Sequence, residues 1–434
     1  MFTMTGPQNV KWVVKNKLCI SCGMCDTACP RVAIKMTRRE SDGAIFPTIN
    51  ETICTRCGVC LTVCYGFNVE HQLNLRVFHS LPNSFLGNCI SFFTGFSNDK
   101  EIHFNSTSGG IVPSLLIHAL SEKLVDSVIV TKMQSGNPPQ AKAFIATTTQ
   151  EILAAVGSKY CPVSLAECLA TIDPSKRYAV VGLPCHIYGM RKLAEANSKV
   201  KNSIVLYIGL ICGGMPAYLG TEYLLSIHNM KNQYVKLEYR GGGWPGRLLI
   251  QNRSSDQQKT VSVSYPEYWQ NLFGYFLPYR CTLCHDGFNE FSDISCGDVW
   301  LPRFTNNDKE GTSLIITRTE KGDRLVHDAF EKRCIQIVAI DGIEAIKSQQ
   351  GIVQFKNLTL KSRMTLSKIC QKKLPSFDLS RTPAASFNNY LVAIDLYLGS
   401  TMASRKDLWW LLNIYVLSKR TIGKYRKWIE NTIN

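Results

Sequence analysis

Two continuous apolar runs near the middle of the chain indicate strands that are buried on both faces. The first covers residues 178–183 and is followed closely by Cys185, and the second covers 203–210 and is followed by Cys212. Apolar runs of about four to eight residues between turn residues are typical of buried sheet strands. Because a helical pattern follows each run, we predict an α/β domain with a mixed, mostly parallel sheet.

Shorter segments on both sides extend this prediction. Thr148-Thr149-Gln150-Glu151 has the form of a capping box, which begins a helix. Residues 71–105 show no clear period and are expected to lie over the neighbouring domain. Further strands are predicted at 33–36, 44–47, 124–130, 141–146, 234–239, 247–251, 261–264 and 314–317.

The last part of the chain is predicted to be a helical tail. Residues 408–417 are almost wholly apolar, and this run is too short for the roughly 20 residues of a membrane span. Two interpretations stay open: a helix that docks on the protein, and an interfacial helix that gives peripheral membrane contact. The basic residues that follow the run are Lys419, Arg420, Lys424, Arg426 and Lys427.

The chain has 434 residues, which suggests more than one domain, and we expect boundaries at 1–70, 71–335 and 336–434. Its formal net charge of +16 is not accompanied by a nucleic-acid-binding motif, so we expect no nucleic acid partner. An anionic redox coenzyme, an acidic electron-carrier protein or an anionic membrane surface fits this charge. Eighteen cysteines without a visible secretory signal indicate the cytoplasm, with thiolates used as metal ligands.

Eight of the cysteines lie in two runs with the spacing C-x2-C-x2-C-x3-C, between residues 19 and 64. This spacing is typical of a two-cluster ferredoxin module, in which the fourth cysteine of each run binds the other cluster. Disulfides and paired zinc sites do not naturally repeat it. We therefore predict an α+β ferredoxin-like domain with two [4Fe-4S] clusters. The predicted ligands are Cys19, Cys22, Cys25 and Cys64 for one cluster, and Cys54, Cys57, Cys60 and Cys29 for the other.

Four more cysteines form a candidate third site. Cys185 and Cys212 each follow a buried strand, so both are expected at the same edge of the sheet, and Cys281 and Cys284 form a C-x2-C pair on a loop. Four such thiolates are enough for a third [4Fe-4S] cluster. A redox dithiol or half of a zinc site remains an alternative for the C-x2-C pair, and Cys296 is a possible substitute ligand.

Several motifs in a fixed order resemble those of the family of coenzyme F420 hydrogenase/dehydrogenase beta subunits. The resemblance extends over roughly residues 15–335 and implies FAD in the α/β domain, a [4Fe-4S] cluster beside it, and electron exchange with an F420-type deazaflavin or a related donor such as NAD(P)H. The residues that carry it are Ser106-Thr107-Ser108-Gly109-Gly110, Gly157 to Pro162, Gly182 to His186, Gly209 to Cys212, Tyr239 to Gly246, Cys281 to Cys284 and Ser292 to Trp300.

The flavin implied by this resemblance has candidate contacts in three of the motifs. A serine- and glycine-rich turn before a helix allows backbone N–H groups to approach a pyrophosphate, although a solvated turn is the simpler alternative. Lys159 is a candidate for a phosphate or the isoalloxazine, although a lone lysine is normally solvated. Arg240 is a candidate for an anionic coenzyme, and a flexible hairpin is the alternative for its glycine-rich segment. The candidate residues in the turn are Ser106, Ser108, Gly109 and Gly110.

Together these features predict an oxidoreductase in which FAD exchanges a hydride with a two-electron carrier and passes single electrons to the clusters. The ferredoxin surface is expected to dock an electron-carrier or catalytic partner protein. Two alternatives come from other classes. One is a cluster-only electron-transfer subunit, and the other is a flavin and iron–sulfur reductase of cell-surface polysaccharide biosynthesis, which the basic tail would attach to a membrane.

Overall fold

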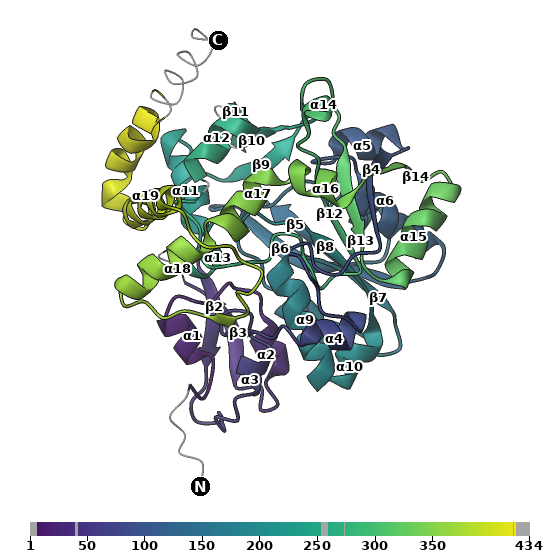
Figure 1. Cartoon of the computed structure of the whole chain (residues 1–434), viewed down its shortest axis with the longest axis horizontal. Helices are drawn as coiled ribbons and strands as arrows, with labels where there is room; N and C mark the ends of the chain where they lie inside the picture. The colour runs from purple at the N-terminus through teal and green to yellow at the C-terminus, as the bar shows by residue number, and fades with distance from the viewer. Residues whose placement is uncertain (1–6, 40–41, 253–258, 273, 420, 422–434) are drawn as a thin grey trace.

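A large mixed sheet forms the centre of the molecule, and the ferredoxin-like module lies beside one end of it (Figure 1). The computed structural model describes residues 7–39, 42–252, 259–272, 274–419 and 421. Within them the sheet has eight strands in the order β14-β4-β13-β12-β8-β7-β5-β6. The strands are β4 (Ser91–Ser97), β5 (Ser127–Gln134), β6 (Gln140–Ala146), β7 (Tyr178–Gly182), β8 (Ile204–Leu210), β12 (Ile294–Asp298), β13 (Ser313–Thr317) and β14 (Ile335–Ala339).

The predicted mixed sheet is confirmed, but the prediction that it is mostly parallel is wrong. Only the central strands β12, β8, β7 and β5 pair in parallel, and in the described chain the four other pairings of this sheet are antiparallel. Antiparallel neighbours need only a short connection, such as the one between β5 and β6, whereas parallel strands need a crossover. The crossover from β7 to β8 runs through α9 (Pro184–Ala196) and α10 (Ser198–Ser203), as the apolar runs predicted.

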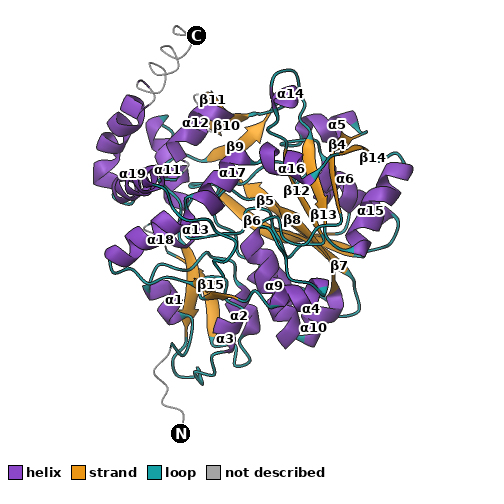
Figure 2. Cartoon of the chain, viewed as in Figure 1, coloured by secondary structure: helices purple, strands orange, loops and turns teal. Residues whose placement is uncertain are grey.

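Helices cover both faces of this sheet (Figure 2). Alternate residues of each strand point to opposite faces, so Val180 packs in the core beneath α9 while Ala179 packs beneath α6 and α15. The further helices of the domain are α4 (Leu73–Phe78), α5 (Lys100–Asn105), α6 (Ile111–Ser121), α7 (Thr149–Leu153), α8 (Ala166–Thr171), α11 (Tyr218–Ile227), α13 (Tyr279–Thr282), α14 (Pro302–Thr305) and α15 (Glu320–Glu331). The capping box predicted at Thr148 and Glu151 is present at the start of α7.

The segment 71–105 does not merely lie over the domain, as we predicted. It contains β4, which is an interior strand between β13 and β14. A Cβ atom at Gly95 in this strand would lie 2.3 Å from the carbonyl oxygen of Gln336, so the close pairing requires a glycine there. Both neighbours of β4 come from the far end of the domain, which a local period in the sequence does not reveal.

A smaller sheet and a helix stand at one end of the large sheet. The strands β9 (Val235–Gly241), β10 (Arg247–Asn252) and β11 (Thr260–Ser264) pair antiparallel in the order β11-β10-β9. The helix α12 (Tyr265–Leu272) follows β11 directly. This unit positions the segment around Arg240 against the large sheet, where that residue bonds to Asp298 at the end of β12.

The ferredoxin-like module has the predicted pair of short strands, β1 (Ile34–Arg38) and β2 (Ile45–Ile49), joined antiparallel. Gly23 and Gly58 precede its short helices in the left-handed conformation, with φ of 85° and 78°, where a side chain would be strained. The remaining elements are α1 (Lys11–Lys15), α2 (Met24–Ala28), α3 (Val59–Thr62) and β3 (Asn68–Val69).

The C-terminal part connects the two domains. Its β15 pairs in parallel with β3 of the ferredoxin-like module. The elements are α16 (Gly342–Ser348), α17 (Gln350–Val353), the π-helix η1 (Gln354–Leu358), α18 (Leu360–Ile369), β15 (Ser376–Phe377), α19 (Phe387–Ala403) and the 3-10 helix η2 (Lys406–Leu408).

One face of the apolar tail is docked on the protein. In the helical residues 409–419, Trp409, Leu412 and Val416 are buried, and Trp409 packs against Tyr223 and Phe276. The basic residues Arg420, Lys424, Arg426 and Lys427 lie outside the described residues. No helix in the described ranges is long and apolar enough to cross a membrane.

Candidate functional site

The structure brings the eight cysteines of the ferredoxin-like module together in the two sets that the spacing predicts. The first pocket is lined by Cys19, Cys22, Cys25 and Cys64, together with Ile20, Met24 and Pro47. The second, called the outer pocket below, is lined by Cys29, Cys54, Cys57 and Cys60. In each pocket three cysteines come from one run and the fourth from the other run. The residues therefore fit two four-thiolate clusters of the ferredoxin kind.

The thiols of the first ferredoxin pocket are held in apolar surroundings. Burial raises the pKa of Cys19, Cys22 and Cys64 to about 12. Such thiols stay protonated at neutral pH unless a metal displaces the proton, since metal binding and deprotonation are coupled. An apolar wall around thiolate ligands also limits the access of water, which is one determinant of cluster potential.

The four cysteines of the predicted third site are near enough to influence one another's charge. Because β7 and β8 are parallel neighbours, Cys185 and Cys212 emerge at the same edge of the sheet. Cys281 and Cys284 face them from the loop around α13, and burial together with the neighbouring thiols raises the pKa of Cys185 far above its usual range. A backbone hydrogen bond of 2.8 Å from the Cys212 nitrogen to the Gly287 oxygen joins the two parts.

Cys296 does not belong to this group. It lies within β12 in an apolar cluster with Ile208 and Ile315. Its thiol pKa is raised to about 12 by burial alone, without a contribution from another thiol. Cys296 is therefore a core residue, because its side chain points to the sheet face that α6 and α15 cover.

A tyrosine connects the third site to the ferredoxin-like module. Tyr65 follows Cys64 in the chain, and its hydroxyl lies 3.2 Å from the Cys284 sulfur. The buried Arg280 donates two hydrogen bonds to the Tyr65 carbonyl oxygen, at 3.2 and 3.0 Å, and its guanidinium stands 4.5 Å from the centre of the Tyr65 ring. The third site is therefore adjacent to the pocket that Cys64 lines.

Sequence reasoning missed the cations of the third site. Lys356, in the π-helix η1, is 1% exposed, and its Cγ atom lies close to Gly287, three residues after Cys284. Burial raises the pKa of the Cys284 thiol, but Lys356 and Arg280 outweigh this effect and bring it to about 7. Arg363 of α18 donates a 2.6 Å hydrogen bond to the Thr282 oxygen on the same loop. In the sequence these residues lie in ordinary helical segments, and only the tertiary structure reveals their position.

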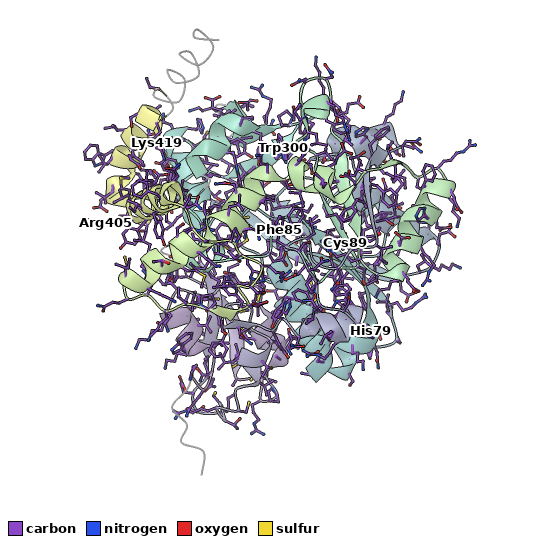
Figure 3. All side chains as sticks on the ribbon, in the orientation of Figure 1. His79, Phe85, Cys89, Trp300, Arg405 and Lys419 are labelled. Atoms are coloured by element: carbon purple, nitrogen blue, oxygen red, sulfur yellow. The ribbon has the colours of Figure 1, made fainter. Side chains whose placement is uncertain are left out.

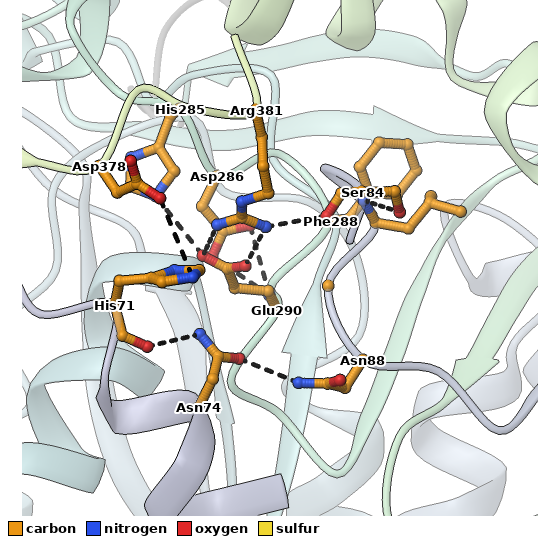
Figure 4. Close-up of polar contacts among 12 residues, drawn as sticks. His71, Asn74, Ser84, Asn88, His285, Asp286, Phe288, Glu290, Asp378 and Arg381 are labelled. Carbon is orange, nitrogen blue, oxygen red and sulfur yellow. Dashed lines mark hydrogen bonds and ion pairs between the residues drawn. The ribbon is translucent and has the colours of Figure 1, made fainter. Parts of the chain in front are cut away.

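A buried polar network continues from this loop (Figure 4). Arg381 donates to the Glu290 carboxylate at 3.0 Å, and His285 lies 3.5 Å from the other oxygen of that carboxylate. Burial and the neighbouring Glu290 raise the pKa of Asp286 to about 6. Burial works against ionisation of Glu290, yet His285 and Arg381 hold its pKa near 2. The network fastens the loop after Cys284 to the C-terminal segment around Arg381.

The segments predicted to bind the flavin also come together. Gly110 has a φ of 72° and begins α6, and a Cβ atom at Gly109 would lie 2.3 Å from the Gly95 oxygen. The Ser108 hydroxyl donates to the Thr312 oxygen at 2.9 Å, so it is already engaged within the chain. The Ser106 hydroxyl oxygen is buried and finds no hydrogen-bond partner among the described residues.

Lys159 and Arg240 are both engaged by the protein itself. The Lys159 ammonium donates to the carbonyl oxygens of Ala155, Val156 and Gly157, and burial lowers its pKa to about 7. The Arg240 guanidinium donates to the oxygens of Pro245 at 2.7 Å and Thr107 at 3.0 Å, and pairs with the Asp298 carboxylate at 2.8 Å. Arg240 therefore fixes the position of the serine- and glycine-rich turn.

Aromatic side chains gather around Arg240. The rings of Tyr160 and Trp269 are 4.4 Å apart, and those of Trp244 and Trp300 are 4.8 Å apart. Tyr265 stacks on Trp269 and Trp300 and lies 4.3 Å beneath the Arg240 guanidinium. Trp300 is at the molecular surface, so this cluster reaches solvent (Figure 3).

Comparisons with known proteins agree with the resemblance in the sequence. Residues 18–65 match the 4Fe-4S dicluster domain, and residues 92–170 and 175–343 match the N-terminal and C-terminal parts of the coenzyme F420 hydrogenase/dehydrogenase beta subunit. The coenzyme F420 hydrogenase subunit beta of Methanococcus voltae is 26% identical over 264 residues, which are 59% of this chain and 87% of that protein.

Two further proteins are similar over more of the chain. A subunit of the F(420)H(2) dehydrogenase of Methanosarcina mazei is 24% identical over 335 residues, 75% of this chain and 87% of that protein. A chain of the F420-reducing [NiFe] hydrogenase complex from Methanosarcina barkeri superimposes with a TM-score of 0.49 and 20% identity, over 67% of this chain and 96% of that one. The chain belongs to the family of coenzyme F420 hydrogenase/dehydrogenase beta subunits and carries a 4Fe-4S dicluster domain.

Proposed function

We propose that the protein is an oxidoreductase that moves electrons between a two-electron hydride carrier and three [4Fe-4S] clusters through FAD. The observation that carries this proposal is the contact between Tyr65 and Cys284, which places the third group of cysteines next to the ferredoxin-like module. Clusters exchange one electron at a time, and a bound flavin supplies the conversion between one hydride and two single electrons. The protein's own contribution is the position and environment of each group.

The FAD site of this proposal lies between the turn at 106–110 and the aromatic cluster around Arg240. The free, buried hydroxyl of Ser106 and the start of α6 supply donors for a pyrophosphate. Tyr160, Trp269 and Trp300 offer ring faces for an isoalloxazine. Arg240 then acts as a positioning residue, because its donors already hold Thr107 and Asp298.

The hydride carrier of the proposal is an F420-type deazaflavin or NAD(P)H, both of which are anionic. The relatives named above are proteins of F420 hydrogenase and F420H2 dehydrogenase, and this supports the deazaflavin. Because these relatives are described as subunits, we also propose a protein partner, with the ferredoxin-like module as the docking face.

Anaerobic mixing with each donor tests the function. Reduced F420 or NADPH should bleach the flavin absorption and then the absorption of the clusters.

Ser106→Ala should weaken flavin retention, whereas Ser121→Ala, at the opposite end of α6, should not. A chain that is purified without flavin and ignores both donors would contradict the proposal and favour a cluster-only electron-transfer subunit.

The exposed face of the tail supports a membrane-surface contact as a second proposal. Opposite the docked residues, Trp410, Ile414 and Leu417 are each more than half exposed, and α19 also exposes Phe387 and Leu391. Apolar residues on one face with lysines and arginines nearby are typical of interfacial helices. Flotation with anionic vesicles should carry the protein upward, and Trp410→Ser with Ile414→Ser should abolish this. Unchanged flotation would exclude the contact and, with it, the membrane-bound polysaccharide reductase.

A further inference from the structure

We propose that Lys356 is a buried counter-charge of the third cluster, which stabilises the reduced state of that cluster and raises its reduction potential. The residue comes from the segment after the family match, which ends at residue 343. This inference rests on the proposed function, because it takes Cys185, Cys212, Cys281 and Cys284 as cluster ligands.

Lys356 is buried beside the cysteine loop. Its side chain is 1% exposed, and its stem passes Gly287, where an added Cβ atom would lie 3.4 Å from the Lys356 Cγ atom and 3.8 Å from the Cys212 oxygen. Burial works against its charge, but the nearby Cys284, Cys212 and Cys281 outweigh this effect and raise its pKa. The lysine therefore lies near three of the four predicted ligands.

The segment that carries Lys356 is fastened to the cysteine loop at several points. Asn357 donates to the His285 oxygen at 3.3 Å, and Arg363 donates to the Thr282 oxygen at 2.6 Å. Leu360 and Met364 pack in one core cluster with Leu283. The wider turn of a π-helix at residues 354–358 accompanies this arrangement, and such turns are frequent at functional sites. The lysine is thus held in place rather than free to turn toward solvent.

The charge balance of the site favours an anionic occupant. A buried cation is costly unless an opposite charge compensates it, and a single Cys284 thiolate would balance only one of the two buried cations Lys356 and Arg280. Four thiolates around an iron–sulfur cube leave a net negative charge. The nearby carboxylates are engaged elsewhere, Glu290 with Arg381 and His285, and Asp286 with the backbone nitrogen of Asn289. Lys356 is therefore available to compensate the cluster.

This arrangement has a direct consequence for electron flow. Each added electron makes a cluster more negative, so a fixed cation at short distance stabilises the reduced state in a site of low dielectric constant. The effect should be confined to the third cluster, since the thiols that interact with Lys356 are predicted ligands of that cluster. A raised potential would make this cluster a good acceptor for electrons that arrive as a hydride.

The test is a potentiometric titration of the holoprotein, followed by electron paramagnetic resonance. Lys356→Met keeps the length of the side chain and removes the charge. We expect the midpoint of the third cluster to move to lower potential while the two ferredoxin midpoints stay in place. Lys356→Arg should remain close to wild type, and Lys368→Met, which removes an exposed charge from α18, should leave all three midpoints unchanged. An unmoved third midpoint in Lys356→Met would overturn the inference.

If Lys356→Met does not assemble the third cluster, its iron content still tests the inference. If Lys356→Met loses about four of about twelve iron atoms and Lys356→Arg keeps them, the charge is needed for assembly and the inference holds. If both variants lose the cluster, the role of Lys356 is packing and the inference fails. Wild-type protein with only about eight iron atoms would instead defeat the proposed function, so the two failures are distinguishable.

Discussion

The outer pocket of the ferredoxin-like module and the third cysteine group use the same side chain in opposite surroundings. The outer pocket has the exposed Cys57, and the exposed side chains of Arg31 and Arg56 line it. The third group is surrounded by the buried cations Arg280 and Lys356. We infer that the outer pocket exchanges electrons with partners. The third cysteine group, called the inner site below, receives electrons from within the chain.

The largest effect should come from removal of an inner ligand. Cys284→Ala is expected to leave about eight iron atoms and to abolish reduction of the ferredoxin clusters by a hydride donor, because the proposed path passes through this site. Iron analysis and anaerobic absorption spectra measure both. Cys296→Ala is the matched control, since that cysteine is equally buried but lies in the sheet core. Normal reduction of the ferredoxin clusters in Cys284→Ala would contradict an electron path through the third cysteine group.

Removal of an outer ligand should have a different consequence. Cys57→Ala is also expected to leave about eight iron atoms, but the inner cluster should still be reduced by the hydride donor at the wild-type rate. Transfer to an external acceptor protein should fall strongly. If the inner cluster is no longer reduced in this variant, the order of the two sites in the path is reversed.

Removal of the hydrogen bond between the two regions should have a moderate effect on the reduction potential of the inner cluster. Tyr65→Phe removes the hydroxyl that lies 3.2 Å from the Cys284 sulfur. Hydrogen bonds to cluster sulfur raise reduction potential, so the inner midpoint should fall, and by less than in Lys356→Met. Potentiometric titration measures the shift. Tyr279→Phe, which removes a hydroxyl bonded to the Lys373 oxygen, should leave it unchanged, and an equal shift in both variants would contradict the assignment.

The smallest effect should come from the surface charges of the outer pocket. Arg56→Glu reverses an exposed charge beside Cys57 and should slow electron transfer to an acidic carrier protein several-fold at low salt. The difference should shrink as ionic strength rises, because exposed charges are screened. Transfer to a small uncharged acceptor should not change. A salt-independent loss would indicate damage to the cluster rather than to docking.

The two regions also differ in how far their sequence predicts them. The ferredoxin-like pockets follow from local spacing, and Gly23 and Gly58 occupy the left-handed positions that allow the loops to bend. For the third site, strand ends predicted that Cys185 and Cys212 share one edge, because β7 and β8 are parallel neighbours. Lys356 lies 72 positions after Cys284 in an ordinary helical pattern, so no local signal placed it beside the thiols.

In the sheet and the flavin segments too, contacts between residues that are distant in sequence could not be predicted. The central apolar runs predicted β7 and β8, but β4 was missed because both of its neighbours are distant in sequence. Arg240 was predicted as a coenzyme contact from its glycine-rich setting. Its partners Thr107 and Asp298 come from other elements, and only their assembly shows that the guanidinium is engaged.

The most direct test of the account is the iron, acid-labile sulfide and flavin content of anaerobically purified protein. We predict about twelve iron atoms, an equal amount of sulfide and one FAD per chain, which three four-iron clusters and one flavin require. About eight iron atoms without flavin would contradict it. The third cysteine group would then hold no cluster, and the chain would carry electrons only through its ferredoxin-like module.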